Sequence, residues 1–204
     1  MGKLSVRGVA KRDVAYDGVE MRFAFHGSAD KTGEALRTVT EQSEAFLEKL
    51  TAMGVNMKEI HSGDLGTDYQ MTGETVRMQA TREITVRMKL ELAFVNRVLD
   101  LIREQESQAD VSCDYFLTDP KALHDELLKE AWEDARRQAL FITQATGQQL
   151  VGVDSVQCAQ NREFPALFCE QNARFAKSGG SLLDELSAPL TTERESIDVV
   201  WLIE

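Results

Sequence analysis

Apolar and polar residues alternate over the first 27 residues of the chain. One alternating set begins at Leu4, and a second runs from Val19 to Phe25. A period of two residues is typical of β-strands with one buried face. Asp17-Gly18 lies between the two sets, and this dipeptide favours a tight turn because both residues tolerate positive φ angles. The pattern therefore predicts a β-hairpin at the start of the chain.

The spacing then changes to three and four residues, which predicts a helix from about residue 30 to residue 53. Asp30 is placed to cap its first turn, and Gly54 suits a left-handed position directly after its last turn. The apolar residues that share one face of this helix are Leu36, Val39, Phe46, Leu47, Leu50 and Met53.

The middle of the chain mixes both periods. Residues 69–73 are predicted to form a loop, and the clean alternation from Ile84 to Leu90 predicts a half-buried strand. Helical spacing returns from Phe94 to Ile102, and strand spacing from Val111 to Leu117. We therefore expect strands and helices to follow one another here.

The longest predicted helix begins at Asp119-Pro120, because aspartate caps free amides and proline is favoured at the first helical position. It ends at Gly147. Alanines at every fourth position along it let another element approach closely, so we expect this helix to lie flat against a sheet or a partner. The predicted seam consists of Ala131, Ala135, Ala139 and Ile142.

Two further strands are predicted, over residues 151–156 and 197–203, with a long excursion over residues 161–192 that has no clear period. Long excursions in compact domains are usually functional or mobile. The arrangement predicts an α+β fold, with an antiparallel or mixed sheet and long helices packed mainly on one face. We expect a single domain over residues 1–204. A division of this domain into two sub-lobes is the alternative.

Charge narrows the set of partners. The chain has 23 Lys and Arg against 34 Asp and Glu, a net charge of -11 at pH 7. The densest basic spots, Lys11-Arg12 and Arg136-Arg137, are too small for a nucleic-acid surface. No stretch approaches the ~20 apolar residues that a membrane span needs. The first residues lack the apolar block of a secretory signal, so we expect a cytoplasmic protein.

Metal-binding and thiol chemistry are not indicated. Cys113, Cys158 and Cys169 have wide gaps and predict reduced thiols, with a Cys158–Cys169 disulfide as the less favoured alternative. His26, His61 and His124 have no second ligand at helical spacing, so they are predicted to be surface or partly buried residues. We expect no metal and no cofactor.

Catalytic motifs are not found either. The string G-x-S-x-G is absent, and Cys113 lies on a predicted strand where a small buried residue is expected. Gly63-Asp64-Leu65-Gly66 is not followed by the lysine of a phosphate loop. Acidic residues on the longest helix, namely Glu126, Glu130, Glu133 and Asp134, fit a solvated face. We therefore assign no catalytic or cofactor-binding residue.

The longest helix carries a recognisable pattern. Its segment Ala131 to Ala139 reads A-x-x-D-A-R-x-x-A, and residues 147–153 read G-x-x-L-x-G-V. This resembles the SIMPL-domain family, the YggE-like proteins. Residues 6–10 resemble the family's opening strand, residues 35–55 its first helix and exit, and residues 199–203 its closing strand. The resemblance covers nearly the whole chain.

The resemblance implies an α+β fold, assembly into homo-oligomers, and loose links to oxidative-stress tolerance and, in animal relatives, to a signalling kinase adaptor. It implies no catalytic residue, and many relatives are exported or periplasmic. Our first hypothesis is a non-enzymatic protein of unknown biochemical role that assembles with itself.

Two alternatives stay open. One is a small-molecule binding protein or unrecognised enzyme with a cleft under residues 161–192. The other is a scaffold for a protein partner, which would need an exposed apolar patch on the same excursion. The residues proposed for that patch are Phe164, Leu167, Phe168 and Phe175.

Overall fold

The computed structural model describes residues 2–72, 75–104, 109–158 and 188–204. The chain divides into two compact units. Of the described residues, unit 1 contains 2–16, 117–158 and 189–204, whereas unit 2 contains 17–72, 75–104, 109–116 and 188. Each unit has its own sheet and its own hydrophobic core.

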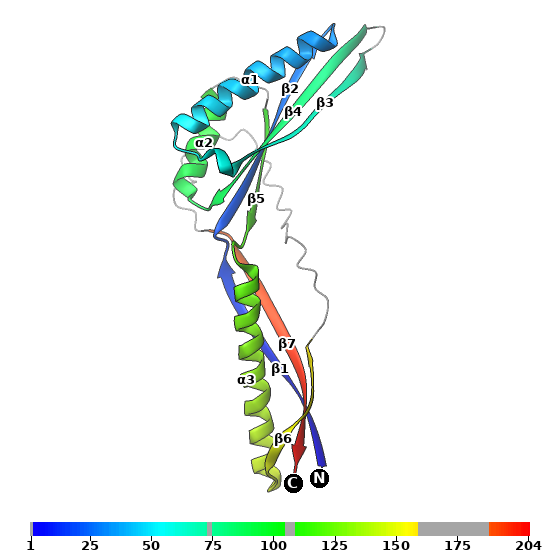
Figure 1. The fold of residues 1–204 in the computed structure, drawn as a ribbon, viewed down its shortest axis with the longest axis vertical. Coiled ribbons are helices and arrows are strands. Elements are labelled where there is room, and N and C mark those ends of the chain that lie inside the picture. The colour runs from blue at the N-terminus through cyan, green and yellow to red at the C-terminus, as the bar shows by residue number, and fades with distance from the viewer. Residues whose placement is uncertain (1, 73–74, 105–108, 159–187) are drawn as a thin grey trace. The chain divides into compact units, whose positions relative to one another are not determined.

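Unit 1 is a three-stranded antiparallel sheet with one long helix on one face (Figure 1). The strand order is β1 (Gly2–Ala15), β7 (Leu190–Ile203) and β6 (Leu150–Cys158). The ladder between β1 and β7 runs without a register shift from Gly2↔Ile203 to Ala15↔Leu190. The pairing of β6 with β7 is less regular, because its register shifts twice.

The long helix of unit 1 is α3 (Pro120–Thr146). As predicted, the Asp119 side chain accepts a hydrogen bond from the Ala122 N–H at 2.9 Å, Pro120 opens the helix, and Gly147 ends it with a φ of 70°. The alanines of the seam are fully buried, but Ile142 is 38% exposed. Thr143 takes its place, because buried positions recur at every fourth residue along this helix. These positions are Leu127, Ala131, Ala135, Ala139 and Thr143.

Unit 2 is a four-stranded antiparallel sheet in the order β3 (Ile60–Thr72), β4 (Thr75–Lys89), β2 (Gly18–Ala29) and β5 (Ala109–Phe116). Helices α1 (Thr32–Ala52) and α2 (Leu92–Glu104) contribute to one core on one face, and the short 3-10 helix η1 (Met57–Glu59) precedes β3. Aromatic rings fill that core. Phe46 of α1 lies 4.7 Å from Phe23 and 5.4 Å from Phe25, measured between ring centroids.

The two units share one topology. In unit 2, β2, α1, β3 and β4 follow in sequence, and β4 lies between β2 and β3 in the sheet. In unit 1, β1, α3, β6 and β7 follow in the same order, and β7 lies between β1 and β6. Both are split β-α-β arrangements, and α2 and β5 complete the ferredoxin-like β-α-β-β-α-β pattern in unit 2 alone. All of unit 2 from β2 to β5 is inserted between β1 and α3.

The predicted hairpin at the start of the chain is wrong. β1 pairs with β7, whereas β2 pairs with β4 and β5. Asp17 is the residue at which the chain leaves unit 1 for unit 2. Asp17-Gly18 allows the chain to change direction, but it does not decide which strands pair. β1 and β2 pair with strands from distant segments, because those strands complete the core of each unit.

Three boundaries also differ from the prediction. Residues 69–72 belong to β3 rather than to a loop, and the residue at the N-cap of α1 is Lys31, without a side-chain hydrogen bond. The predicted excursion over 161–192 lies outside the described residues up to residue 187, and its last three residues belong to β7. The α+β fold with antiparallel sheets and helices on one face is confirmed.

Candidate functional site

The alanine pattern of α3 is explained by its contact with β1. A Cβ atom added to Gly8 would lie 1.9 Å from the Ala131 carbonyl oxygen and 2.8 Å from the Ala135 Cβ. The backbone of the helix therefore rests directly on the strand, which only glycine on one side and alanine on the other allow. Ala131 and Ala135 of the pattern therefore pack the helix against the strand.

Asp134, the acidic residue of the same pattern, joins the helix to the edge of β1. Its Oδ2 accepts a hydrogen bond from the Val9 N–H at 3.1 Å and another from the Gln138 side chain at 2.7 Å. Gln138 in turn donates to the Arg7 carbonyl at 3.3 Å. The Val9 N–H above all, with help from Gln138 and Arg137, holds the pKa of Asp134 below its usual range.

The prediction of a solvated acidic face is therefore wrong for Asp134, whose side chain is only 18% exposed. It holds for the exposed Glu133. Glu126 and Glu130 are also largely exposed, and both accept hydrogen bonds from Arg12 of β1. Asp134 acts on the backbone of its own fold, so its lowered pKa indicates a structural carboxylate rather than a general acid.

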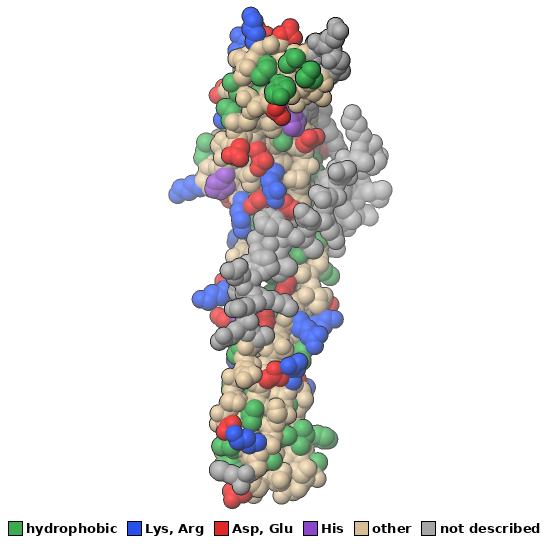
Figure 2. All heavy atoms as spheres, turned by 90° about the vertical axis from the view of Figure 1, so that its right-hand side faces the viewer, with side chains coloured by type: hydrophobic (Ala, Val, Ile, Leu, Met, Phe, Trp, Pro, Cys, Tyr) green, Lys and Arg blue, Asp and Glu red, His purple; other side chains and the backbone are tan. Residues whose placement is uncertain are grey.

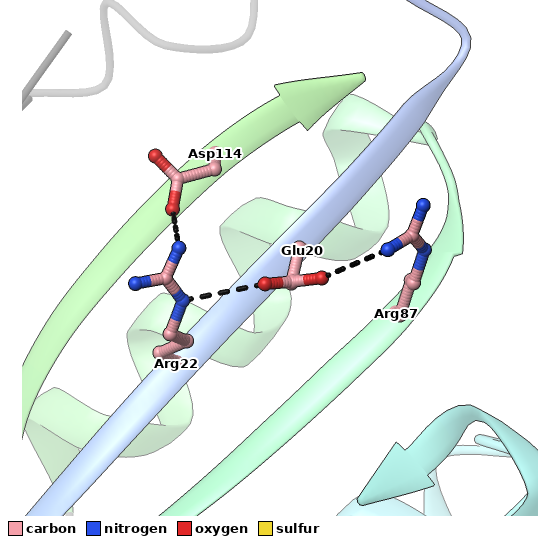
Figure 3. Close-up of polar contacts among 4 residues, drawn as sticks. All are labelled: Glu20, Arg22, Arg87 and Asp114. Carbon is pink, nitrogen blue, oxygen red and sulfur yellow. Dashed lines mark hydrogen bonds and ion pairs between the residues drawn. The ribbon is translucent and has the colours of Figure 1, made fainter. Parts of the chain in front are cut away.

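A charged cluster lies on the face of the unit 2 sheet that does not carry the core (Figure 3). Glu20 of β2 accepts from the Arg22 Nε at 3.3 Å and from the Arg87 Nη1 at 3.2 Å, and Arg22 donates to Asp114 of β5. Only about a sixth of each acidic side chain is exposed, 16% for Glu20 and 15% for Asp114. The Arg87 guanidinium lies 4.0 Å from the centroid of the Phe116 ring.

This cluster balances its own charge. Two carboxylates meet two guanidinium groups, and each carboxylate has an arginine partner. Side chains from β4, β2 and β5 are joined in this way, so the cluster fixes the register of three strands. A site for an anionic ligand would need an excess of positive charge, which these four residues do not supply.

The three histidines are half-buried or exposed, as predicted. His26 contacts the Thr81 hydroxyl through Nδ1 and the Asp110 carboxylate through Nε2, both at 3.2 Å. His124 lies 2.9 Å from Glu195, and His61 is exposed. Among the described residues, no group of three or more His, Cys, Asp or Glu side chains could hold a metal ion.

Thr81, His26 and Asp110 are ordered as hydroxyl, imidazole and carboxylate, which is the order of a catalytic triad. The geometry argues against that role. The Asp110 side chain is 88% exposed, so water competes for it, and Thr81 pairs with both β2 and β3 in the middle of the sheet. The backbone N–H groups of β4 around Thr81 lie between two paired strands, so they are not free to stabilise an oxyanion.

The described cysteines are reduced and differ in accessibility. Cys113 is 3% exposed in the core of unit 2, as predicted, and burial raises the pKa of its thiol to about 11. Such a thiol is a poor nucleophile at neutral pH. Cys158 is free and exposed at the end of β6, and Cys169 lies outside the described residues.

Large exposed apolar side chains are concentrated in two places. On unit 1 they are Val151, Val153 and Val156 of β6, here called the β6 patch, and Leu140, Phe141 and Ile142 near the end of α3. Leu140 and Phe141 lie on the same side of that helix as the charged residues Glu133, Arg136 and Arg137. On unit 2 they form the arm patch, defined as Leu65, Tyr69, Met71 and Val76 of the β3–β4 hairpin. Figure 2 shows small groups of hydrophobic side chains between charged ones on one face of the molecule.

A shallow depression on α3 is lined by two of these apolar residues, Leu140 and Phe141. Because every residue that lines it comes from one helix, it cannot enclose a small molecule as ligand pockets do. Its lining residues are Glu133, Arg136, Arg137, Leu140, Phe141 and Gln144. The aromatic patch proposed on residues 164–175, and the cleft proposed under 161–192, fall outside the described residues up to residue 187.

The hydrophobic periodicity did not indicate these two patches. The valines of β6 predict a strand with one buried face. They do not indicate that α3 packs mainly over β1 and β7. A signal was present in β6 nevertheless, because eight of its nine residues are uncharged although the chain is strongly acidic.

The structure thus defines an α+β protein of two split β-α-β units whose most distinctive surface is apolar. The family model of SIMPL, described as a protein of unknown function (DUF541), matches residues 4–199 and so extends over both units. The chain belongs to this family. No curated protein matches the sequence significantly. No helix in the described part of the chain is long and apolar enough to cross a membrane.

Proposed function

We propose that this SIMPL-domain protein is a non-catalytic interaction protein that assembles with copies of itself. The observation that carries the proposal is the gathering of exposed apolar side chains into the β6 patch and the arm patch, one on each unit. Scattered exposed apolar residues are normal on a protein surface, but grouped ones mark contact sites.

The polar groups of the described residues support a non-catalytic role. The charged cluster is neutral and internally paired. Asp134 is engaged by the backbone of β1, and the Cys113 thiol is buried and protonated at neutral pH. A catalytic centre keeps a reactive group free and close to a pocket, and each of these groups already has a structural task.

Charge sets the conditions for assembly. With a net charge of -11, copies of the chain repel one another over a distance of about 10 Å at 0.1 M salt. Association must therefore use surfaces on which charge is low, and apolar burial must outweigh the repulsion. Salt screens the repulsion and leaves the apolar contribution in place, so assembly should strengthen as ionic strength rises.

Sedimentation velocity of the whole chain tests the proposal. We expect the weight-average sedimentation coefficient to rise with protein concentration from low to high micromolar, and to rise further between 50 and 500 mM NaCl. A strict monomer at high micromolar concentration in both salts would contradict the proposal. The family's link to oxidative-stress tolerance is proposed as the biological setting, and peroxide survival of cells that lack the protein would test it.

A further inference from the structure

A row of cations follows β1 on the face of the unit 1 sheet opposite α3. Lys3, Arg7 and Lys11 share this face because they are separated by even steps along the strand. The first two cations have acidic partners within the sheet. The Lys3 ammonium group lies 2.7 Å from the Asp154 carboxylate, and Arg7 donates two hydrogen bonds to Asp198, at 2.7 and 2.8 Å.

The third cation of the row, Lys11, faces another cation. Its partner in the ladder between β1 and β7 is Arg194. The Val9 N–H points to the outer edge of β1, where Asp134 accepts its hydrogen bond, so the odd-numbered residues of β1 form the non-hydrogen-bonded pairs of this ladder. Side chains lie closest in such pairs, and like charges placed directly opposite each other destabilise a sheet.

A like-charged pair in unit 2 is neutralised by its own neighbours. Glu20 of β2 faces Asp114 of β5 in the ladder, and Arg22 and Arg87 bind the two carboxylates. The exposed Lys11 and Arg194 side chains have no ion pair or hydrogen bond with another described residue. Their two positive charges are therefore available to an anion from outside the sheet.

The groups beside this pair differ on its two sides. On one side Ser196 shares the face with Arg194, and its hydroxyl can donate a further hydrogen bond. Asp198, the next residue along that face, is already neutralised by Arg7. On the other side, the Asp13 carboxylate accepts a hydrogen bond from a threonine hydroxyl of β7 at 2.6 Å and forms no ion pair with either cation. Its negative charge opposes a bound anion.

We infer that Lys11 and Arg194, with the Ser196 hydroxyl, bind a doubly charged phosphate group, either as inorganic phosphate or as a small phosphomonoester. Two positive charges match the two negative charges of this group. The guanidinium fork can bind two phosphate oxygens and the ammonium group a third. One phosphate group needs no larger basic surface than this pair. The inference does not depend on self-assembly, because a single copy of the chain supplies the whole site.

Titration of the whole chain with sodium phosphate and, separately, with glycerol 3-phosphate tests the inference by amide chemical shifts in NMR. At about pH 7.5 a phosphomonoester is doubly charged, because its second pKa is about 6. We expect saturable shifts at residues 10–13 and 192–196 with a dissociation constant of ~1 mM. Sodium chloride at equal ionic strength should not produce them. Tighter binding of one anion identifies the source of the phosphate group, and no saturable shift with either anion would overturn the inference.

Single substitutions locate the binding energy. K11Q and R194Q each remove one cation, and we expect each to raise the dissociation constant ~10-fold. D13N removes the opposing charge and should lower that constant ~3-fold. R77Q makes the same change in charge at an exposed arginine of β4 and should leave it within about twofold. Unchanged affinity in K11Q and R194Q, or an equal loss in R77Q, would overturn the inference.

A further variant separates loss of the site from loss of folding. R194E places a carboxylate opposite Lys11, so it should abolish phosphate binding and at the same time raise the denaturation midpoint of unit 1 in phosphate-free buffer. Tryptophan fluorescence reports that midpoint, because both tryptophans lie in unit 1. A lowered midpoint would show that the two cations do not repel each other, and it would overturn the inference.

Discussion

Units 1 and 2 arrange a strand, a helix and two further strands in the same order, yet they hold the helix to the sheet in different ways. In unit 2, Phe46 of α1 packs between Phe23 and Phe25 of β2. In unit 1, α3 rests on Gly8 through Ala131 and Ala135, with backbone almost against backbone. One topology therefore tolerates both a wide layer filled by aromatic rings and a narrow layer closed by small residues.

Apolar surface is nevertheless left exposed at the same place in both units. Two helices share the sheet of unit 2, whereas the single helix of unit 1 is drawn close to β1 and β7. The strand that follows the helix in each split arrangement, β3 or β6, lies at a sheet edge and carries exposed apolar residues. The exposed edge strand is therefore common to the wide layer and the narrow layer.

The largest expected effect comes from emptying the aromatic layer. Phe46→Ala should lower the free energy of unfolding of unit 2 by about 3–5 kcal/mol, because it leaves a cavity between two other rings. Chemical denaturation followed by circular dichroism measures the loss. Both tryptophans lie in unit 1, so the tryptophan fluorescence transition should move much less. Phe141→Ala, at a position that is 73% exposed, is the control and should change stability by less than about 0.5 kcal/mol.

Adding a methyl group to the narrow layer should have the next largest effect. Gly8→Ala forces the helix away from β1, and we expect unit 1 to lose about 3 kcal/mol. Tryptophan fluorescence during denaturation reports it, since Trp132 and Trp201 lie 5.2 Å apart in this unit. Gly33→Ala in α1 meets no atom within 4 Å and should be neutral or slightly stabilising. Equal tolerance of both substitutions would refute the narrow layer.

A smaller effect is expected from Asp134→Asn, which weakens the hydrogen bond to the Val9 N–H by about 1–2 kcal/mol at pH 7. The pKa of Asp134 is lowered in the folded state, so its carboxylate stabilises the fold above the unfolded pKa of about 4 and loses this effect as pH falls through the folded pKa. The gap in stability between wild type and variant should therefore narrow on acidification below about pH 4. Denaturation curves at pH 7 and pH 3 measure it, and a gap that widens would contradict this role.

The smallest perturbation is chemical labelling. A thiol reagent at pH 7.5 should modify the exposed Cys158 within minutes and Cys113 only after denaturation, because the buried Cys113 thiol has a pKa of about 11. Peptide mass spectrometry identifies the modified residue. Rapid labelling of Cys113 in the native protein would show that the aromatic layer opens readily.

Local signals in the sequence were enough to predict the elements and not enough to pair them. The caps at Asp119 and Gly147 and the alanine spacing defined α3 almost to the residue, because these features act within a few residues. Asp17-Gly18 was misleading, since the partners of β1 and β2 lie far along the chain. The role of Asp134 was missed for the same reason, because its hydrogen-bond donor is the Val9 N–H, 125 residues away in the sequence.

Surface exposure was the hardest property to predict. Val151 and Val153 have the alternation of a half-buried strand, and the exposure of the β6 valines depends on how far α3 reaches across the sheet. That reach is set by Gly8 together with the alanines, which belong to different parts of the sequence. The family resemblance predicted self-assembly, but it indicated no surface for it.

Hydrogen exchange at two protein concentrations tests the central claim most directly, because it reports on single strands of the unmodified chain. If the exposed apolar patches are the contact surfaces, amides of residues 151–157 in β6 or of residues 65–71 in β3 should exchange more slowly at high micromolar than at low micromolar concentration. Amides of residues 3–11 in β1 should be unaffected. Exchange in both β6 and β3 that does not depend on concentration, while sedimentation shows assembly, would contradict the account.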